Sequence, residues 1–252
     1  LACISQYLLP DFQSVMTFIW QHGGVYVNDD GVSSGLNTPE AIAGFKELME
    51  LFTVYKIPQA PVPMNTFASG EYPLVVGGNW NYSAVDQGFP QIRGKWSVGL
   101  TPGTVRSDGF LSHSIYNGPL PIGIFKNSKY QKEGWEFIKW FMQDEVQAEY
   151  GRRVMQVMPS GFFFSANMNV ASKIDYFPED HVKVMYEQSY HSMAPRYGLG
   201  SVVSQRHVTN AAMSVILQGT DPEKALLEAH DLVQAEMKRK QVEFARFISR
   251  LK

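Results

Sequence analysis

The chain has 252 residues, of which 44% are hydrophobic and 18% charged, and its formal net charge at pH 7 is -2. This length allows one large domain or two small ones, and the near-neutral charge gives no reason to expect nucleic acid or an anionic membrane surface as partner. The single cysteine, Cys3, excludes an intramolecular disulfide bond and a cysteine-based metal site. No apolar run approaches the roughly 18 residues that a membrane span needs.

In the first hundred residues, start and stop signals predict helices separated by short strands. Asp11 is a candidate N-cap for a helix that ends at Gly23 and Gly24, and Thr38 with Pro39 starts a second helix. Short apolar runs that stop at turn residues predict buried strands. The elements expected here are helices over 11–21 and 38–52, a helical turn over 67–70, and strands over 25–27, 73–76 and 96–100.

The later part of the chain is richer in helix signals. The polar, Gly- and Ser-containing segment 104–118 predicts a long loop, and the Pro- and Gly-containing run 119–125 predicts a strand near a sheet edge. Ser128 is a candidate helix cap, and Asp144 with Gln147 has the spacing of a capping box. The alternation of strands and helices indicates an α/β fold. The remaining expectations are helices over 128–142, from 144, over 178–190, over 201–219 and from 221; an irregular segment over 155–170; and inward-facing Trp135, Ile138, Phe141, Met142 and Leu232.

The segment after the 73–76 strand points most clearly to a binding site. Gly77 and Gly78 stop the strand, and amide and aromatic residues follow at once. Such residues suit a concave site for a polar, ring-shaped ligand, because they supply a flat face with donors and acceptors around it. A packed tryptophan with ordinary turn asparagines is the alternative interpretation. The candidate residues are Asn79, Trp80, Asn81 and Tyr82.

The order of these features resembles the carbohydrate-type extracellular solute-binding proteins of ABC importers, over nearly the whole chain from about residue 11. The run 78–80 matches a Gly-x-Trp motif of that family. Three further segments occur in the same order as in that family. They are the helix start at 37–40, the segment 127–129 before a Trp/Phe-rich helix, and the segment 158–161 after that helix. The resemblance implies a two-lobed α/β fold of the type II periplasmic-binding-protein kind. It also implies that this is a carboxy-terminal fragment with the amino-terminal lobe largely missing.

The resemblance further implies a division of the chain and more ligand contacts. Residues 1–100 and 156–252 are expected in the carboxy-terminal lobe, and residues 101–155 in an excursion into the amino-terminal lobe that includes the hinge crossings. The implied contacts are Asp11, Gln13, Tyr116, Asn117 and Arg206. Alternatives stay open for three of these positions. The residue at the start of the first helix can be a plain N-cap, and the residues before 119–125 can form an ordinary turn. Arg206 lies where the family commonly has an aromatic or polar contact; no aromatic is present here, and its guanidinium can pair with a carboxylate or with hydroxyls.

The expected function is a binding module without chemistry. It would capture a sugar or oligosaccharide between two lobes and deliver it to ABC permease subunits, outside the cytoplasm, in the periplasm or as a cell-surface lipoprotein. No cofactor or metal is expected, because the histidines lack metal-ligand spacing and no phosphate-binding glycine loop occurs. One alternative is a glycoside-processing enzyme, which needs two carboxylates at one bond; only Glu71 and Asp86 lie near the aromatic loop. Another is a binding protein for a non-sugar solute.

The expected absence of one lobe has two consequences for this chain. Half of the cleft would be missing, so ligand binding by these residues alone would be weak or undetectable. Apolar side chains of the excursion would lose their cover and become exposed, and this would favour dimerisation or domain swapping.

Overall fold

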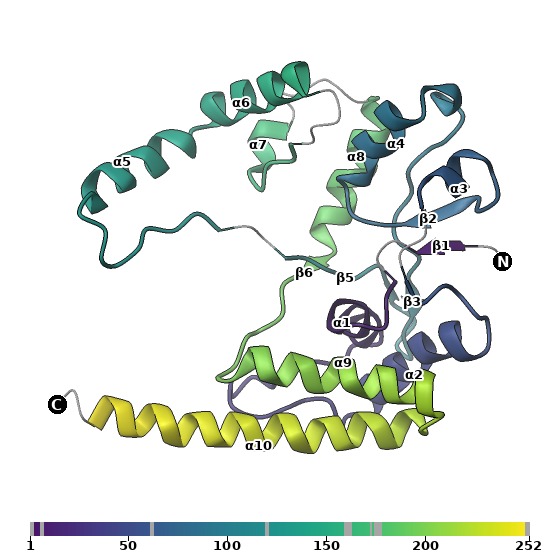
Figure 1. The fold of residues 1–252 in the computed structure, drawn as a ribbon, viewed down its shortest axis with the longest axis vertical. Helices are drawn as coiled ribbons and strands as arrows, with labels where there is room; N and C mark the ends of the chain where they lie inside the picture. The colour runs from purple at the N-terminus through teal and green to yellow at the C-terminus, as the bar shows by residue number, and fades with distance from the viewer. Residues whose placement is uncertain are drawn as a thin grey trace.

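A computed structural model describes residues 3–5, 8–60, 63–118, 121–158, 163–171, 173 and 178–249 (Figure 1). Helices form a packed body, short strands lie beside it, and two further helices extend away as an arm. The elements are β1 (Cys3–Ser5), α1 (Phe12–Gln21), α2 (Pro39–Thr53), α3 (Asn65–Ala68), β2 (Leu74–Val76), α4 (Asn81–Gly88), the 3-10 helix η1 (Pro90–Ile92), β3 (Thr104–Val105), β4 (Leu111–Ser112), β5 (Ile115–Tyr116), α5 (Gln131–Phe141), α6 (Asp144–Val157), α7 (Met168–Ala171), α8 (Glu179–Tyr190), β6 (Ser192–Met193), α9 (Ser201–Gln218) and α10 (Pro222–Ser249).

The packed body consists of α1, α2, α9 and α10. In Figure 1, α9 and α10 run side by side and α1 is seen almost end-on above them. Apolar side chains recur at helical spacing on each of these helices, so every helix has one face that the others cover. Truncating a fully buried leucine here is expected to cost about 2–5 kcal/mol. The fully buried side chains include Val15, Met16, Ile19, Phe45, Leu48, Met49, Val208, Leu226 and Val233.

The predicted caps of these helices are confirmed. Asp11 Oδ1 accepts a hydrogen bond from the backbone nitrogen of Ser14 at 3.0 Å, and Thr38 Oγ1 accepts one from the backbone three residues on at 3.3 Å. Gly23 and Gly219 adopt left-handed backbone angles, with φ of 91° and 70°, just after α1 and α9. The helices expected over 178–190, over 201–219 and from 221 are present as α8, α9 and α10.

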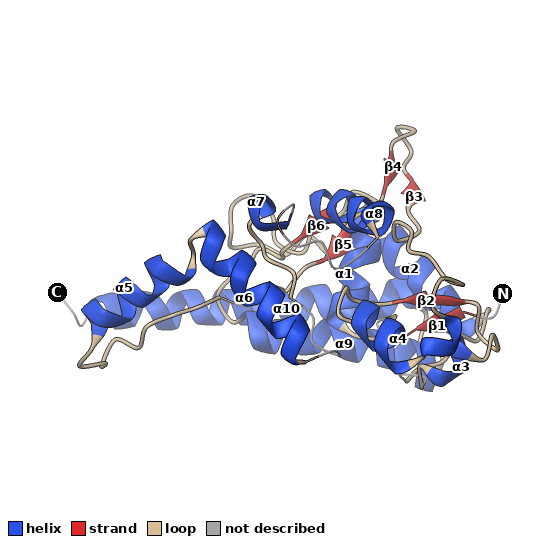
Figure 2. Ribbon diagram, turned by 90° about the horizontal axis from the view of Figure 1, so that it is seen from above, coloured by secondary structure: helices blue, strands red, loops and turns tan. Residues whose placement is uncertain are grey.

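The strands pair in three two-stranded sheets among the described residues. Strands β1 and β2 are parallel, with Ser5 opposite Val76, and β5 and β6 are parallel, with Tyr116 opposite Met193. Strands β3 and β4 form an antiparallel hairpin that projects from the body (Figure 2). Two strands that run in the same direction end at the same edge, so each parallel pair delivers two chain segments to one place.

The strand predictions in the first hundred residues are only partly right. The strand at 73–76 is confirmed as β2, but it is not buried, because Leu74 is 50% exposed. Residues 25–27 contribute one isolated bridge, between Val27 and Ser34, and residues 96–100 form no strand. A short apolar run does not reveal whether a partner strand lies beside it, and here the local signal misled.

The prediction of one long loop over 104–118 is wrong, because this segment contains β3, β4 and β5. These strands have two residues each, too few for an alternating pattern to show in the sequence. The strand expected over 119–125 is absent from residues 121–125, and residues 119–120 lie outside the described residues.

Helices α5 and α6 form an arm that extends away from the body (Figure 1). The expectation that the apolar side chains of α5 face inward is wrong, because none of its residues is buried. The separate expectation of exposed apolar surface in this part of the chain is confirmed. The arm contributes one small buried cluster, around Ala148 and Val170. Its exposed apolar residues include Phe125, Tyr130, Trp135, Phe137, Trp140 and Met142.

Three further local predictions need correction. Ser128 does not cap α5; its hydroxyl accepts a hydrogen bond from the backbone nitrogen of Tyr130 in the turn before the helix. Asp144 is the first residue of α6, not its cap, and its carboxylate accepts a hydrogen bond from Asn167 Nδ2 at 2.6 Å. Helix α6 continues to residue 157, into the segment expected to be irregular. Leu232, expected on the inner side of α10, is 51% exposed.

Candidate functional site

Most of the predicted site residues lie just beyond the carboxyl ends of the parallel strands. The chain leaves β2 toward Trp80 and leaves β1 toward Asp11. It leaves β5 at Asn117 and leaves β6 toward Tyr197. In open α/β sheets, ligands bind outside the carboxyl ends of the strands. The ends of the two parallel pairs are therefore the candidate ligand-contact regions.

Trp80 lies directly on the backbone of Gly78. A Cβ atom added to Gly78 would lie 2.2 Å from Cη2, 2.3 Å from Cζ3 and 2.4 Å from Cζ2 of the Trp80 ring. Only glycine leaves room for the indole in this position. Trp80 nevertheless remains 50% exposed. An aromatic ring supported by backbone on one side and accessible over half of its surface can serve as a stacking platform.

Asn79 and Asn81 flank this platform. Asn79 is exposed, and Asn81 is the first residue of α4. The side-chain nitrogen of Asn81 is buried and has no hydrogen-bond partner among the described residues. A buried donor without an acceptor costs roughly 1–3 kcal/mol, and this nitrogen has no surface open to a ligand in this conformation. Of the two side-chain amides, that of the exposed Asn79 is the one accessible beside the ring.

The Tyr82 side chain points into the protein, on the side of α4 away from the Trp80 ring. It is only 7% exposed, and its hydroxyl lies 2.8 Å from His181 Nδ1. Its ring meets Trp96 edge-on at 4.8 Å between centroids. Burial, with smaller contributions from the nearby carboxylates of Asp86 and Asp180, raises the pKa of Tyr82 to about 12. Tyr82 joins α4 to α8 and is not placed to contact a ligand at the Trp80 ring.

Asp11 and Gln13 lie at the first turn of α1. One oxygen of the Asp11 carboxylate is used by the cap to Ser14. Partial burial raises the pKa of Asp11, although the hydrogen bonds from Ser14 oppose the shift. Gln13 is exposed on the first turn. The capping role predicted as the alternative for Asp11 is therefore real, and a ligand contact through the second oxygen remains compatible with it.

Tyr116 is the centre of an aromatic cluster at the end of β5. Its ring stacks on Trp20, with centroids 6.1 Å apart and an interplanar angle of 15°, and meets Phe12 edge-on at 6.3 Å. Its hydroxyl lies 2.9 Å from that of Tyr197. The next residue, Asn117, is exposed, and its Nδ2 donates a weak hydrogen bond to a serine hydroxyl at the start of β6 at 3.4 Å. The structure thus joins Tyr116 to a residue that lies 81 positions later.

Arg206 is not brought to these residues. It is exposed on α9, whereas Ser204 and Val208, two positions before and after it, are fully buried. Residues two apart on a helix point to opposite sides, so Arg206 points away from the packed body. No contact between Arg206 and another predicted site residue occurs within the described ranges.

Two features of the site were missed by sequence reasoning. Tyr197 was overlooked because its only signal is an aromatic in a Gly- and Pro-containing loop, and its role depends on β5 pairing with β6. Trp20 was read as part of a helix, although its ring supports Tyr116. Neither contact is local in sequence, so no motif could have revealed it.

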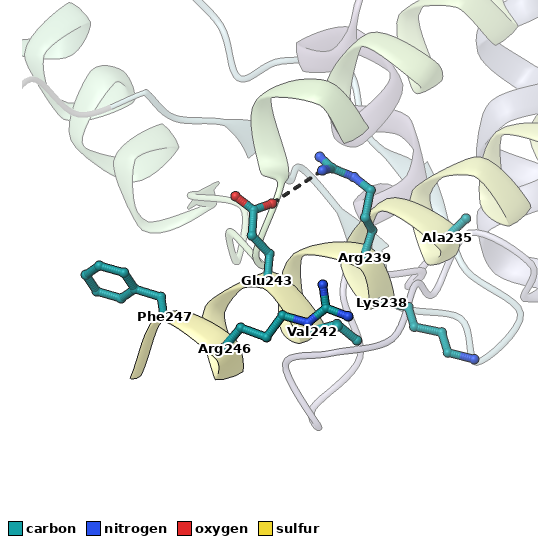
Figure 3. A pocket seen from close by; sticks show the side chains of 7 residues that line it. All are labelled: Ala235, Lys238, Arg239, Val242, Glu243, Arg246 and Phe247. Atoms are coloured by element: carbon teal, nitrogen blue, oxygen red, sulfur yellow. Dashed lines mark hydrogen bonds and ion pairs between the residues drawn. The ribbon is translucent and has the colours of Figure 1, made fainter. Parts of the chain in front are cut away.

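The hollow along α10 does not make a competing ligand site. Figure 3 shows a hollow along the end of α10, but all of its lining residues belong to that one helix, and a single helix cannot enclose a ligand. The Arg239–Glu243 ion pair, at 3.3 Å, lies across it. Among the described residues there is no metal-binding group of three or more histidine, cysteine or acidic side chains. None of the described helices has the length and apolar character to cross a membrane.

Comparison with known proteins identifies the family. Residues 6–161, more than half of the chain, match the family described as bacterial extracellular solute-binding protein. This chain belongs to that family. A curated relative, the maltotriose-binding protein of Pyrococcus abyssi, is 29% identical over 122 residues, which are 47% of this chain and 26% of that protein.

Solved structures of family members match nearly the whole chain. A solute-binding protein of an ABC transporter from Thermotoga lettingae, bound with alpha-D-tagatose, has a TM-score of 0.69 at 18% identity and matches 94% of this chain. The sugar-binding protein MalE from Xanthomonas citri has a TM-score of 0.69 at 17% identity and matches 96% of this chain. The predicted type II periplasmic-binding α/β fold is therefore confirmed. The chain covers 58% and 60% of these two structures, less than two thirds of their length.

Proposed function

We propose that this chain contributes to the sugar-binding component of an ABC importer, which acts outside the cytoplasm and delivers its ligand to the importer's permease subunits. Family membership, the maltotriose-binding relative and the tagatose-bound neighbour support this proposal. The observation that carries the sugar assignment is the half-exposed Trp80 ring, which rests on Gly78 beyond the end of β2.

The geometry gives each group a role in binding. The C–H face of a sugar ring would stack on the Trp80 indole, and the amide of Asn79 would hydrogen-bond to its hydroxyls. No covalent bond is made or broken, and closure of two lobes around the sugar would produce the form that a permease recognises.

The proposal includes the division of the chain into lobes. Residues 1–100 and 156–252 would belong to the carboxy-terminal lobe. Residues 101–155 would form an excursion into the other lobe that includes the hinge crossings, and the first part of this segment, with Arg106 and Tyr116, still contacts α1. The support is physical: α1, α2, α9 and α10 share one core, whereas α5 in the arm buries none of its residues. An apolar helix face of this kind is the side expected to pack against the rest of an amino-terminal lobe.

The test is a thermal-shift screen of the full-length protein that contains this chain, against neutral mono- and oligosaccharides, because these residues alone are expected to bind weakly or undetectably. A ligand at a hundred times its dissociation constant stabilises the folded state by about 2.7 kcal/mol. Trp80→Ala should abolish the shift while the circular dichroism spectrum stays unchanged. Trp135→Ala is the matched control, because Trp135 is 55% exposed, close to the 50% of Trp80, and lies in the arm. No response to any sugar, or an unchanged response in Trp80→Ala, would contradict the proposal.

A glycoside-processing enzyme is the weaker alternative, and no observation favours it. Asp86 accepts a hydrogen bond from Arg93 Nε at 3.2 Å and is thereby held in an ion pair. Glu71 is exposed in the turn before β2. A glycosidase needs two carboxyl groups about 5–10 Å apart across the scissile bond. Turnover of a glycoside by the chain, lost on substitution of either carboxylate, would restore this alternative.

A further inference from the structure

The hydroxyl groups of Tyr116 and Tyr197 meet where β5 and β6 end. The backbone nitrogen of Asn117 donates to the carbonyl oxygen of Met193 at 2.8 Å, which fixes the ends of the two strands beside each other. Four residues beyond Met193, the chain places the Tyr197 hydroxyl oxygen 2.9 Å from that of Tyr116. The pair therefore depends on the parallel pairing, and it lies at a strand end as the Trp80 platform does.

The pair has unused hydrogen-bonding capacity. When one hydroxyl donates to the other, a single proton is used, so the second O–H group and acceptor positions on both oxygens stay available. Tyr197 is 57% exposed, so these groups are accessible from solvent. Two adjacent hydroxyls that both donate and accept match the pattern that a vicinal diol presents.

Tyr116 is held rigidly in place. Its ring is packed between Trp20, stacked on it, and Phe12, edge-on to it. Its backbone nitrogen donates to Thr17 Oγ1 at 3.0 Å. A group whose ring and backbone are both fixed loses little conformational entropy when a ligand binds to it. This is the arrangement expected of a binding residue more than of a freely moving surface tyrosine.

The charge around the pair suits an uncharged ligand. Burial, the hydrogen bond and charge of Tyr197, and the carboxylate of Asp11 together raise the pKa of Tyr116 to about 12, so its hydroxyl stays protonated at physiological pH. The nearby cation Arg196 is paired with Asp29 at 2.6 Å. The pair therefore presents neutral hydroxyls, and the cation next to Tyr197 in the sequence already has a partner.

We propose that the hydroxyls of Tyr116 and Tyr197 form a polar subsite for two adjacent hydroxyls of a neutral ligand, with Tyr197 as a specificity-determining contact. This inference rests on the proposed sugar-binding function. It adds a second point of contact at β5 and β6 to the aromatic platform that follows β2.

The decisive variant is Tyr197→Phe, which removes one hydroxyl and keeps the ring. Titration of the full-length protein that contains this chain with maltotriose should show affinity lowered about threefold to tenfold, the loss expected for one hydrogen bond. Tyr190→Phe is the matched control, because Tyr190 is 77% exposed on α8, and it should bind as the wild type does. Tyr116→Phe should repeat the loss, which guards against a folding defect in one variant.

Unchanged maltotriose affinity in Tyr197→Phe, together with loss in Trp80→Ala, would overturn the subsite and leave the proposed function standing. Absence of sugar binding by the wild type would overturn both the function and the subsite.

Discussion

Replacing Gly78 by alanine puts a methyl group inside the space of the Trp80 ring. The added Cβ would lie 2.2–2.4 Å from three ring atoms. Carbon atoms in contact lie about 3.5 Å apart or more, so the ring must retreat by about 1.3 Å at the closest atom. Because Trp80 is half exposed, it can rotate toward solvent, and we expect a stability loss of less than about 1 kcal/mol. The proposed sugar platform is then lost while the fold is kept.

Fluorine NMR of the chain with fluorine-labelled tryptophan measures the displacement of the Trp80 ring directly. The chain has five tryptophans, and the Trp80 resonance can be assigned as the one missing in Trp80→Phe. In Gly78→Ala this resonance should move while the other four stay in place, and sugar affinity should fall to the level of Trp80→Ala. Gly88→Ala is the control, because a Cβ at Gly88, the last residue of α4, meets nothing within 4 Å. A Trp80 resonance unchanged in Gly78→Ala would refute the reasoning, with or without a sugar present.

Three further predictions concern stability and association. Arg106 donates to the last two backbone carbonyls of α1, at 2.6 and 2.9 Å, so Arg106→Ala should lower the free energy of unfolding by about 1–3 kcal/mol; urea melts that differ by less than their error would contradict this. The exposed face of α5 should make the wild-type chain self-associate, and Trp135→Glu with Trp140→Glu should reduce the association; sedimentation showing a strictly monomeric wild type would count against it. Burial raises the pKa of Asp11 above 3.8, so its stabilising effect is fully present below 3.8 and is lost as pH rises through the folded-state pKa. The stability of Asp11→Asn relative to wild type should therefore rise over that window, and pH-independent differences between their melts would disprove it.

The parts of the fold that the sequence predicts are those with local causes. The caps at Asp11 and Thr38 each use a side chain and a backbone nitrogen three residues on, so both can be recognised in the sequence. The strands are two or three residues long, and their existence depends on partners far along the chain, as with Ile115 and Ser192. No local pattern carries that information.

In the candidate site too, residues with a local sequence signal were predictable, and residues placed by long-range strand pairing were not. Trp80 was predicted because it directly follows a strand and a glycine pair, which is a local signal. Tyr82 was placed with it by proximity, although α4 starts at once and turns the two residues to opposite sides. Tyr197 became a candidate only when the pairing of β5 with β6 placed it beside Tyr116.

Helix α1 links the candidate site to the β3–β4 hairpin as one stiff rod. It has 10 residues and is therefore about 15 Å long. Asp11 caps one end, Thr17 holds the backbone of Tyr116 near its middle, and the Arg106 guanidinium binds the carbonyls at its other end. Because a helix of this length bends little, a displacement of the first turn of α1 would be carried to its far end. The Arg106 contacts would then carry it on to the β3–β4 hairpin.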